Sequence, residues 1–191
     1  MSYVFGSIIG YIIGSIPFSF LVGKVFGRVD LRKKGSGNLG TTNVIRNLGL
    51  GAGILAYALD MLKGLIPVLI IRQLWGYEVA IISGMAAIIG HCYSVFTSFH
   101  GGKGVAVSSG VIFAIDPIIA IILTTGQLIV FFATRMMGLA SIITAVALPI
   151  VTYLMRGIGP LLYASFFMTP FVIWQHRDNL KRLLQGTENK L

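Results

Sequence analysis

The stretch LGAGILAYALDMLKGLIPVLIIR, residues 50–72, is apolar apart from Asp60, Lys63 and the arginine that ends it. It is longer than the roughly 20 apolar residues that a helix needs to cross the hydrocarbon core of a membrane. Similar stretches occupy residues 3–23, 78–98, 104–115, 117–134, 138–155 and 158–175. A backbone in lipid has to pair its own polar groups, and these stretches are too uniformly apolar for barrel strands. The sequence therefore predicts an all-α fold, a polytopic membrane helix bundle with seven transmembrane helices.

The composition agrees with this class, since 55% of the 191 residues are hydrophobic and only 11% are charged. The apolar stretches follow one another closely, without a linker, which predicts a single domain over residues 1–191. Between the fourth and fifth stretches stands IDP, residues 115–117, where aspartate before proline favours a helix end. The fourth stretch is short for a full crossing, so five or six crossings are alternatives to seven.

The net charge of +9 is distributed unevenly along the chain. With seven crossings, twelve of the 15 Lys and Arg residues fall on one side of the membrane, and Lys63 lies inside a crossing. By the positive-inside rule this side is cytoplasmic, which places the N-terminus outside and the C-terminus inside. This distribution explains the basic charge without a nucleic-acid partner.

Two glycine-rich segments lie on the predicted cytoplasmic side. The first is GSGNLGTTN (Gly35–Asn43), followed by Arg46, and the second is FHGGKGVAVSSG (Phe99–Gly110), which contains Lys103. Glycines let backbone amides approach an anion, a helix start offers free N–H groups, and a cation adds charge, so both segments suit phosphate binding. The alternative for each is a plain turn. The second segment lacks the P-loop pattern, because Gly104 stands where Ser or Thr would follow the lysine.

Candidate phosphate ligands are the polar and glycine residues of these segments. They are Asn38, Thr42, Asn43, Gly101, Gly102 and Gly104. Ser141, at the predicted cytoplasmic end of the sixth stretch, is a further candidate donor to a ligand.

The tail WQHRDNLKRLLQGTENK, residues 174–190, forms a third polar cluster. His176, Asn179 and Arg182 are three residues apart, so on a helix they share one side. A ligand-binding face and an amphipathic helix at the membrane interface are both compatible with this pattern.

Inside the apolar stretches, Asp60 and Lys63 lie three residues apart on one helical face. Charges at this depth face the protein interior and pair, so we expect a structural ion pair, with a functional pair as the alternative. The lone His91 is expected to be a hydrogen-bonded core residue rather than a catalyst. The three histidines and six acids show no ligand-spaced cluster, so no metal site is predicted.

Four segments together carry a family resemblance: SGNLGTTNVIR (36–46), ALDMLKG (58–64), GHCYSVFTSFHGGKGVA (90–106) and HRDNLKRLLQGTENK (176–190). In this order they resemble the acyl-phosphate-dependent glycerol-3-phosphate acyltransferases, the PlsY family. The resemblance implies a bacterial enzyme of the cytoplasmic (inner) membrane. Such an enzyme transfers an acyl group from acyl phosphate to the 1-hydroxyl of glycerol 3-phosphate and forms lysophosphatidic acid and phosphate, the start of phospholipid synthesis. No cofactor is implied, and the partners are the two substrates and the membrane lipids.

The resemblance also implies roles for individual residues. Ser36, Arg46, Lys103, His176 and Asn179 would be active-site residues. Gly101, Gly102 and Gly104 would belong to the phosphate-binding motif, with Ser141 near the glycerol phosphate, and Glu188 would be structural.

Many other glycerolipid acyltransferases use a His-x4-Asp motif, whose histidine activates the acceptor hydroxyl. Here Phe96, Val105 and Lys181 stand at the aspartate positions that follow the three histidines. The hypothesis is therefore substrate-assisted transfer, in which the donor phosphate accepts the proton. The rival classes are a transporter or flippase for a phosphorylated solute, with Asp60 and Lys63 as a coupling pair, and a scaffold without a ligand.

Overall fold

The computed structural model describes all 191 residues, and every regular element in it is helical. This confirms the predicted all-α class. The chain divides into two compact units, Met1–Ile115 and Asp116–Leu191. A single domain over residues 1–191 stays a prediction.

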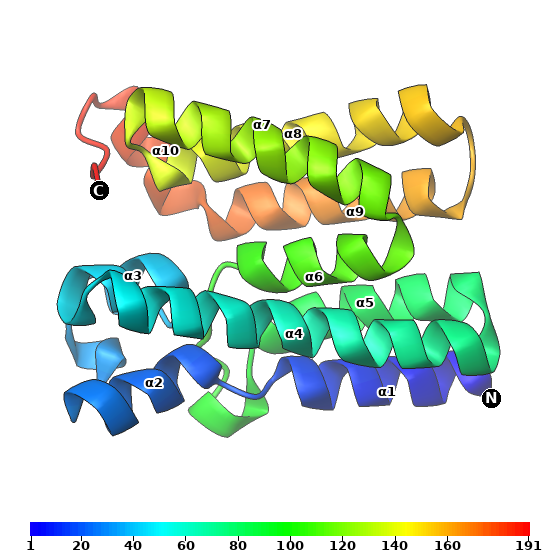
Figure 1. Ribbon diagram of the computed structural model, residues 1–191, viewed down its shortest axis with the longest axis horizontal. Helices are drawn as coiled ribbons and strands as arrows, with labels where there is room; N and C mark the ends of the chain where they lie inside the picture. The colour runs from blue at the N-terminus through cyan, green and yellow to red at the C-terminus, as the bar shows by residue number, and fades with distance from the viewer. The chain divides into compact units, whose positions relative to one another are not determined.

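The first unit is built around α4, which packs against every other α-helix of the unit (Figure 1). The helices of this unit are α1 (Ser2–Gly14), α2 (Phe18–Gly27), η1 (Leu31–Lys33), α3 (Thr41–Leu48), α4 (Leu50–Trp75), α5 (Tyr77–Cys92), η2 (Val95–Thr97) and α6 (Val105–Ile115). The contact of α1 with α5 is close because glycines of α1 face α5. A Cβ on Gly10 would collide with Ser83, and one on Gly14 with Ala87. Small residues at such positions let helices in a membrane approach closely.

The second unit consists of α7 (Pro117–Thr134), α8 (Met137–Arg156), α9 (Pro160–Gln175) and α10 (Arg177–Leu184). Helix α8 packs between α7 and α9, and α10 contacts α8 and α9. The chain end returns to the α7–α8 connection, where the amide of Leu191 donates to the carbonyl of Arg135 at 2.9 Å.

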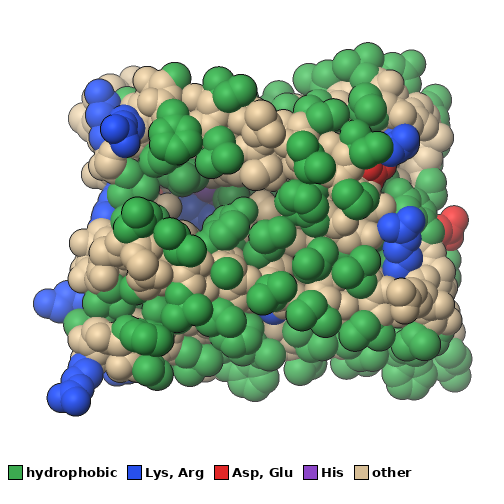
Figure 2. All heavy atoms as spheres, in the orientation of Figure 1, with side chains coloured by type: hydrophobic (Ala, Val, Ile, Leu, Met, Phe, Trp, Pro, Cys, Tyr) green, Lys and Arg blue, Asp and Glu red, His purple; other side chains and the backbone are tan.

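Five helical segments are long and apolar enough to cross a membrane. They are Ser2–Gly27, Leu50–Trp75, Tyr77–Thr97, Pro117–Thr134 and Met137–Arg156. Large hydrophobic side chains on these segments are exposed, for example Ile54, Ile66 and Phe132, at 49–65%. Figure 2 shows hydrophobic side chains along the helices of the visible face, with most visible Lys and Arg side chains near helix ends. Lipid chains rather than water suit such a surface. The count of seven crossings stays a prediction.

The predicted stretch 3–23 lies within the candidate membrane span Ser2–Gly27, but it forms two helices rather than one. The chain forms α1 and α2 with a break at Ser15–Pro17. Pro17 has no amide hydrogen, and its ring clashes with the carbonyl four residues earlier, which favours a break at this point. The carbonyls that the break releases find side-chain donors: Lys63 Nζ donates to Ile16 O at 2.6 Å and Ser94 Oγ to Ser15 O at 2.5 Å.

The predicted helix end at residues 115–117 is confirmed. Helix α6 ends at Ile115, and the Asp116 side chain accepts hydrogen bonds from the amides of Ile118 and Ile119, which begin α7. With 11 residues, α6 is about 16 Å long, which is short for a hydrocarbon core of about 30 Å. The predicted helix over residues 104–115 is confirmed, and its crossing of the membrane stays a prediction, like the count of seven. Its free carbonyls are capped by Arg72, which donates to Ala114 O and Ile115 O at 2.8 and 3.1 Å.

Candidate active site

Asn43 organises the first glycine segment from within. Its side chain is 2% exposed, and its Nδ2 donates to the carbonyls of Leu31, Lys34 and Asn38 at 3.0–3.2 Å. Its Oδ1 accepts from the amide of Ser36 at 3.1 Å. These contacts fold residues 31–38 around one buried amide group. They give Asn43 a structural task, while its predicted phosphate contact stays a prediction.

Hydrophobic residues hold the same segment against the helices. Leu31, Leu39 and Val44 are at most 3% exposed and form a core cluster with Val22 of α2 and Ala56 of α4. The segment is therefore a packed structure rather than a loose turn.

Asp30 caps the short helix η1, which precedes the first glycine segment. Its carboxylate accepts from the Arg32 amide at 3.1 Å and from the Arg32 guanidinium at 2.8 and 3.0 Å. These hydrogen bonds lower the pKa of Asp30 to about 2, so it stays charged at neutral pH.

The catalytic candidates of this segment are exposed. Ser36 lies on the surface, and its Oγ is 3.4 Å from the amide of Asn38, which donates to it. Arg46 is exposed in the last turn of α3, and Thr42 is half-buried in its first turn. The buried frame around Asn43 thus presents Ser36 and Arg46 outward, where a ligand can reach them.

The second glycine segment folds back on the end of α5. The amide of Gly102 donates to the carbonyl of His91 at 3.2 Å. A Cβ on Gly101 would collide with the His91 carbonyl, and one on Gly102 would collide with the His91 ring. Only glycine permits this approach at either position. Gly104, with φ of +88°, then leads into α6, and the half-buried Lys103 lies between the glycines.

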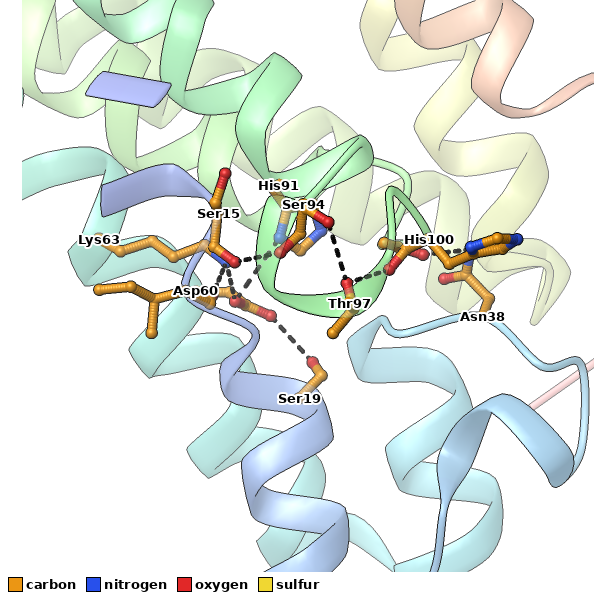
Figure 3. A network of polar contacts seen from close by, with 11 residues as sticks. Ser15, Ser19, Asn38, Asp60, Lys63, His91, Ser94, Thr97 and His100 are labelled. Carbon is orange, nitrogen blue, oxygen red and sulfur yellow. Dashed lines mark hydrogen bonds and ion pairs between the residues drawn. The ribbon is translucent and has the colours of Figure 1, made fainter. Parts of the chain in front are cut away.

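The two glycine segments are hydrogen-bonded to each other. Gly101 O accepts from the amide of Leu39 at 3.3 Å and from Asn38 Nδ2 at 3.4 Å. Figure 3 shows His100 on the loop that also carries Thr97. Thr97 Oγ1 donates to His100 O at 2.5 Å and ties this loop to η2. The segments that carry Ser36 and Lys103 therefore form one structure, with the first turn of α6 beside them.

A buried polar network lies under these loops (Figure 3). Asp60 Oδ1 is 2.7 Å from Lys63 Nζ and 3.6 Å from His91 Nδ1, and Ser19 Oγ donates to Asp60 Oδ2 at 2.9 Å. The predicted ion pair of Asp60 and Lys63 is confirmed. Its link to Ser19 and His91 was not predicted from the sequence, although Pro17 in GSIPFS signalled the helix break that this network serves.

In the second unit the tail forms a cluster of its own around Glu188, which is 8% exposed. Glu188 Oε1 accepts from Asn179 Nδ2 at 2.6 Å, and Oε2 accepts from Arg182 Nε at 3.0 Å. The predicted shared side of Asn179 and Arg182 is thus confirmed. A Cβ on Gly138 would collide with the Asn179 amide, so α8 and the tail are in close contact.

His176 and Ser141 are buried within the second unit. His176 Nδ1 is 2.9 Å from the carbonyl of Val172, and because a carbonyl only accepts, Nδ1 carries the hydrogen. Ser141 Oγ donates to Met137 O at 2.8 Å and accepts from Gln127 Nε2 at 3.3 Å. Both side chains are therefore held in one orientation.

Comparison with known proteins decides the family. The family model for glycerol-3-phosphate acyltransferase matches residues 4–186. The chain belongs to the glycerol-3-phosphate acyltransferase family. The acyltransferase of Geotalea daltonii is 44% identical over 94% of this chain and 92% of that protein, and that of Thermoanaerobacter pseudethanolicus is 39% identical over 100% and 96%.

Solved structures agree with this assignment. Crystal structures of PlsY (YgiH), an integral membrane glycerol 3-phosphate acyltransferase, match this chain in a glycerol 3-phosphate form and a lysophosphatidic acid form. The TM-scores are 0.94 and 0.92, the identities 39% and 38%, and each match covers 100% of this chain and 96% of the other. This acyltransferase is therefore an integral membrane enzyme. Its family favours acyl transfer over the transporter and scaffold alternatives.

Proposed function

We propose that this acyltransferase takes its acyl group from acyl phosphate and transfers it to the 1-hydroxyl of glycerol 3-phosphate. The products are lysophosphatidic acid and inorganic phosphate. The glycerol 3-phosphate and lysophosphatidic acid forms of the similar PlsY structures support the acceptor and the product.

The observation that carries the proposal is the hydrogen bond between Leu39 and Gly101. It joins the segment of Ser36 to the segment of Lys103 at the start of α6, where the first-turn amides have no partner within the helix. Backbone amides, a helix N-terminus and a cation form a good anion site. Both proposed substrates carry a phosphate, so such a site can serve either of them.

In the proposed reaction the 1-hydroxyl oxygen attacks the carbonyl carbon of acyl phosphate. The new bond is the ester C–O bond, and the bond that breaks joins the carbonyl carbon to the phosphate oxygen. The leaving phosphate takes the hydroxyl proton, so no protein base is needed, in keeping with the lack of a His-x4-Asp motif. Lys103, Arg46 and backbone amides stabilise the charge that develops on the phosphate and the carbonyl oxygen.

The remaining candidates have supporting roles in this proposal. Ser36 orients a substrate, and Asn38 and Thr42 contact phosphate. His176 and Asn179 are active-site residues, and Ser141 contacts the glycerol phosphate. The fixed orientations of His176 and Ser141 suit such positioning. Asp60, Lys63 and Glu188 are structural.

The proposed location is the bacterial cytoplasmic membrane, with the glycine loops and the C-terminus in the cytoplasm and the N-terminus outside. The unequal distribution of Lys and Arg supports this orientation. In this orientation the loops face the water-soluble glycerol 3-phosphate of the cytoplasm. Membrane lipids surround the helices, and the acyl chain of acyl phosphate is soluble in the membrane.

The proposal is tested with the purified enzyme in detergent. Palmitoyl phosphate and glycerol 3-phosphate should yield lysophosphatidic acid and phosphate in equal amounts, whereas palmitoyl-CoA should yield neither. Product from palmitoyl-CoA alone would contradict the proposed donor. Uptake of glycerol 3-phosphate into liposomes without acyl transfer would instead support a transporter.

A further inference from the structure

His91, near the end of α5, contacts the second glycine segment, which we call the glycine loop. Its carbonyl accepts the amide of Gly102 at 3.2 Å, and its ring lies where a Cβ on Gly102 would stand. The backbone of Leu39 bounds the same position, because its carbonyl would be 2.9 Å from that Cβ. Gly102 is thus enclosed between His91 and the first glycine segment.

The ring of His91 in turn lies beside the Asp60 carboxylate of α4. Asp60 Oδ1 is 3.6 Å from His91 Nδ1, and Asp60 is fixed by Lys63 at 2.7 Å and by the Ser19 hydroxyl at 2.9 Å (Figure 3). Asp60 is 1% exposed and Lys63 4% exposed. Burying charges so completely is costly, and a positioning task would explain the placement of this pair.

Asp60 and His91 form in space a carboxylate–imidazole pair that the sequence does not contain as a His-x4-Asp motif. A general base would need an open ring nitrogen within hydrogen-bond reach of the substrate hydroxyl. His91 is 6% exposed, and Gly102 packs against the Nε2 edge of its ring. The geometry therefore suits support of the loop rather than proton transfer.

We propose that His91 and Asp60 are positioning residues for acyl transfer. Asp60 fixes the imidazole, and His91 holds Gly101 and Gly102 so that the amides near Lys103 are set for a substrate phosphate before it binds. A loop that is ordered in advance loses less entropy on binding. This inference rests on the proposed phosphate site at the glycine loop.

The first test is steady-state kinetics of His91→Ala and His91→Asn in detergent, with thermal unfolding measured on the same samples. His91→Ala should raise KM for glycerol 3-phosphate or acyl phosphate about tenfold, equivalent to about 1.4 kcal/mol, and change kcat much less. His91→Asn keeps an N–H group near the Nδ1 position and should recover part of the loss. If His91→Ala does not fold, the KM of His91→Asn is measured instead and should lie above that of the native enzyme.

The control for simple destabilisation is Val79→Ala, a buried position on the same helix. It should lower the unfolding temperature without changing KM. The role of Asp60 is tested with the double variant Asp60→Asn/Lys63→Gln, which removes both charges. These two changes should raise KM in the otherwise native enzyme. In an enzyme that already carries His91→Ala, they should cause little further increase in KM.

The outcomes separate this inference from the phosphate site itself. If Lys103→Ala raises KM while His91→Ala in folded protein does not, the phosphate site stands and the positioning role is overturned. Loss of kcat with unchanged KM in His91→Ala would also overturn it, because it would place His91 in the chemistry. An unchanged KM in Lys103→Ala would overturn the phosphate site and this inference with it.

Discussion

The amide of Leu39 donates a hydrogen bond of 3.3 Å to the carbonyl of Gly101, and this contact joins two polar segments that are distant in the sequence. Each segment alone is compatible with a turn. Joined, they present a serine, a lysine and the start of a helix on one structure, which is the arrangement on which the proposed phosphate site depends.

Ser36→Ala should lower kcat at least about tenfold in folded protein, since positioned polar groups contribute at least this much to many enzymes. Its hydroxyl accepts only a long hydrogen bond of 3.4 Å and lies on the surface, so its loss should leave the unfolding temperature nearly unchanged. Turnover and thermal unfolding are measured together, with Ser7→Ala on α1 as the matched control. Full activity would show that the Ser36 hydroxyl is dispensable.

Asn43→Ala should destabilise the enzyme by about 2 kcal/mol or more, because it removes the donor of one buried and two part-buried hydrogen bonds to carbonyls. Asn43→Asp should be no better, since a carboxylate cannot donate to those carbonyls. Thermal unfolding in detergent measures both, with the exposed Asn189→Ala as control. An Asn43→Ala protein of native stability and raised KM would instead favour the predicted phosphate contact.

Part of the fold could be predicted from the sequence, whereas the structural role of Asn43 could not. The lengths of the apolar stretches predicted the helices, and Asp116 before Pro117 predicted the end of α6. The buried role of Asn43 was not predictable, because its partners at 31, 34 and 38 become neighbours only when the loop folds. The same holds for His91, which reads as an ordinary core histidine until α4 brings Asp60 beside it.

The break between α1 and α2 was missed for a different reason. The stretch stays apolar overall, and only Pro17, between Ser15 and Ser19, marked the break. What makes the break tolerable in a membrane is supplied from elsewhere in the chain, by Lys63 on α4 and Ser94 after α5.

Glu188→Gln should lower stability, because Glu188 accepts hydrogen bonds from both Asn179 and Arg182 in a nearly buried site. Removing the charge of the buried Glu188 weakens the bond from Arg182, whose side chain is 33% exposed, at a cost of about 1–3 kcal/mol. Thermal unfolding of the variant is compared with that of Glu78→Gln, whose partner is a tyrosine hydroxyl near the N-terminus. Equal, small losses in both variants would contradict a structural role for Glu188.

Asp116 gives the fold a defined pH dependence. Hydrogen bonds from Arg156 at 2.6 and 3.2 Å lower the pKa of Asp116 below its ordinary value. A lowered carboxyl pKa stabilises the fold above the unfolded-state value of about 4, and this stabilisation is lost as pH falls through the folded-state pKa. Because Arg156 is nearly half exposed, we expect a contribution of about 1 kcal/mol or less.

The variant Asp116→Asn isolates this effect, since asparagine can still cap α7. The difference in unfolding temperature between native enzyme and variant should be constant from pH 8 to about 5 and shrink below about pH 4. A difference that grows on acidification would contradict the assigned direction.

The most direct test of the central claim is the KM for glycerol 3-phosphate and for palmitoyl phosphate in Lys103→Ala, with Lys103→Arg and the exposed tail variant Lys190→Ala as controls. Loss of a charge-assisted contact of about 1.5–3 kcal/mol should raise the KM of one substrate roughly 10- to 100-fold. Lys103→Arg should retain much of the affinity, and Lys190→Ala should match the native enzyme. Unchanged KM values for both substrates in folded Lys103→Ala would show that the joined glycine loops do not hold a substrate phosphate.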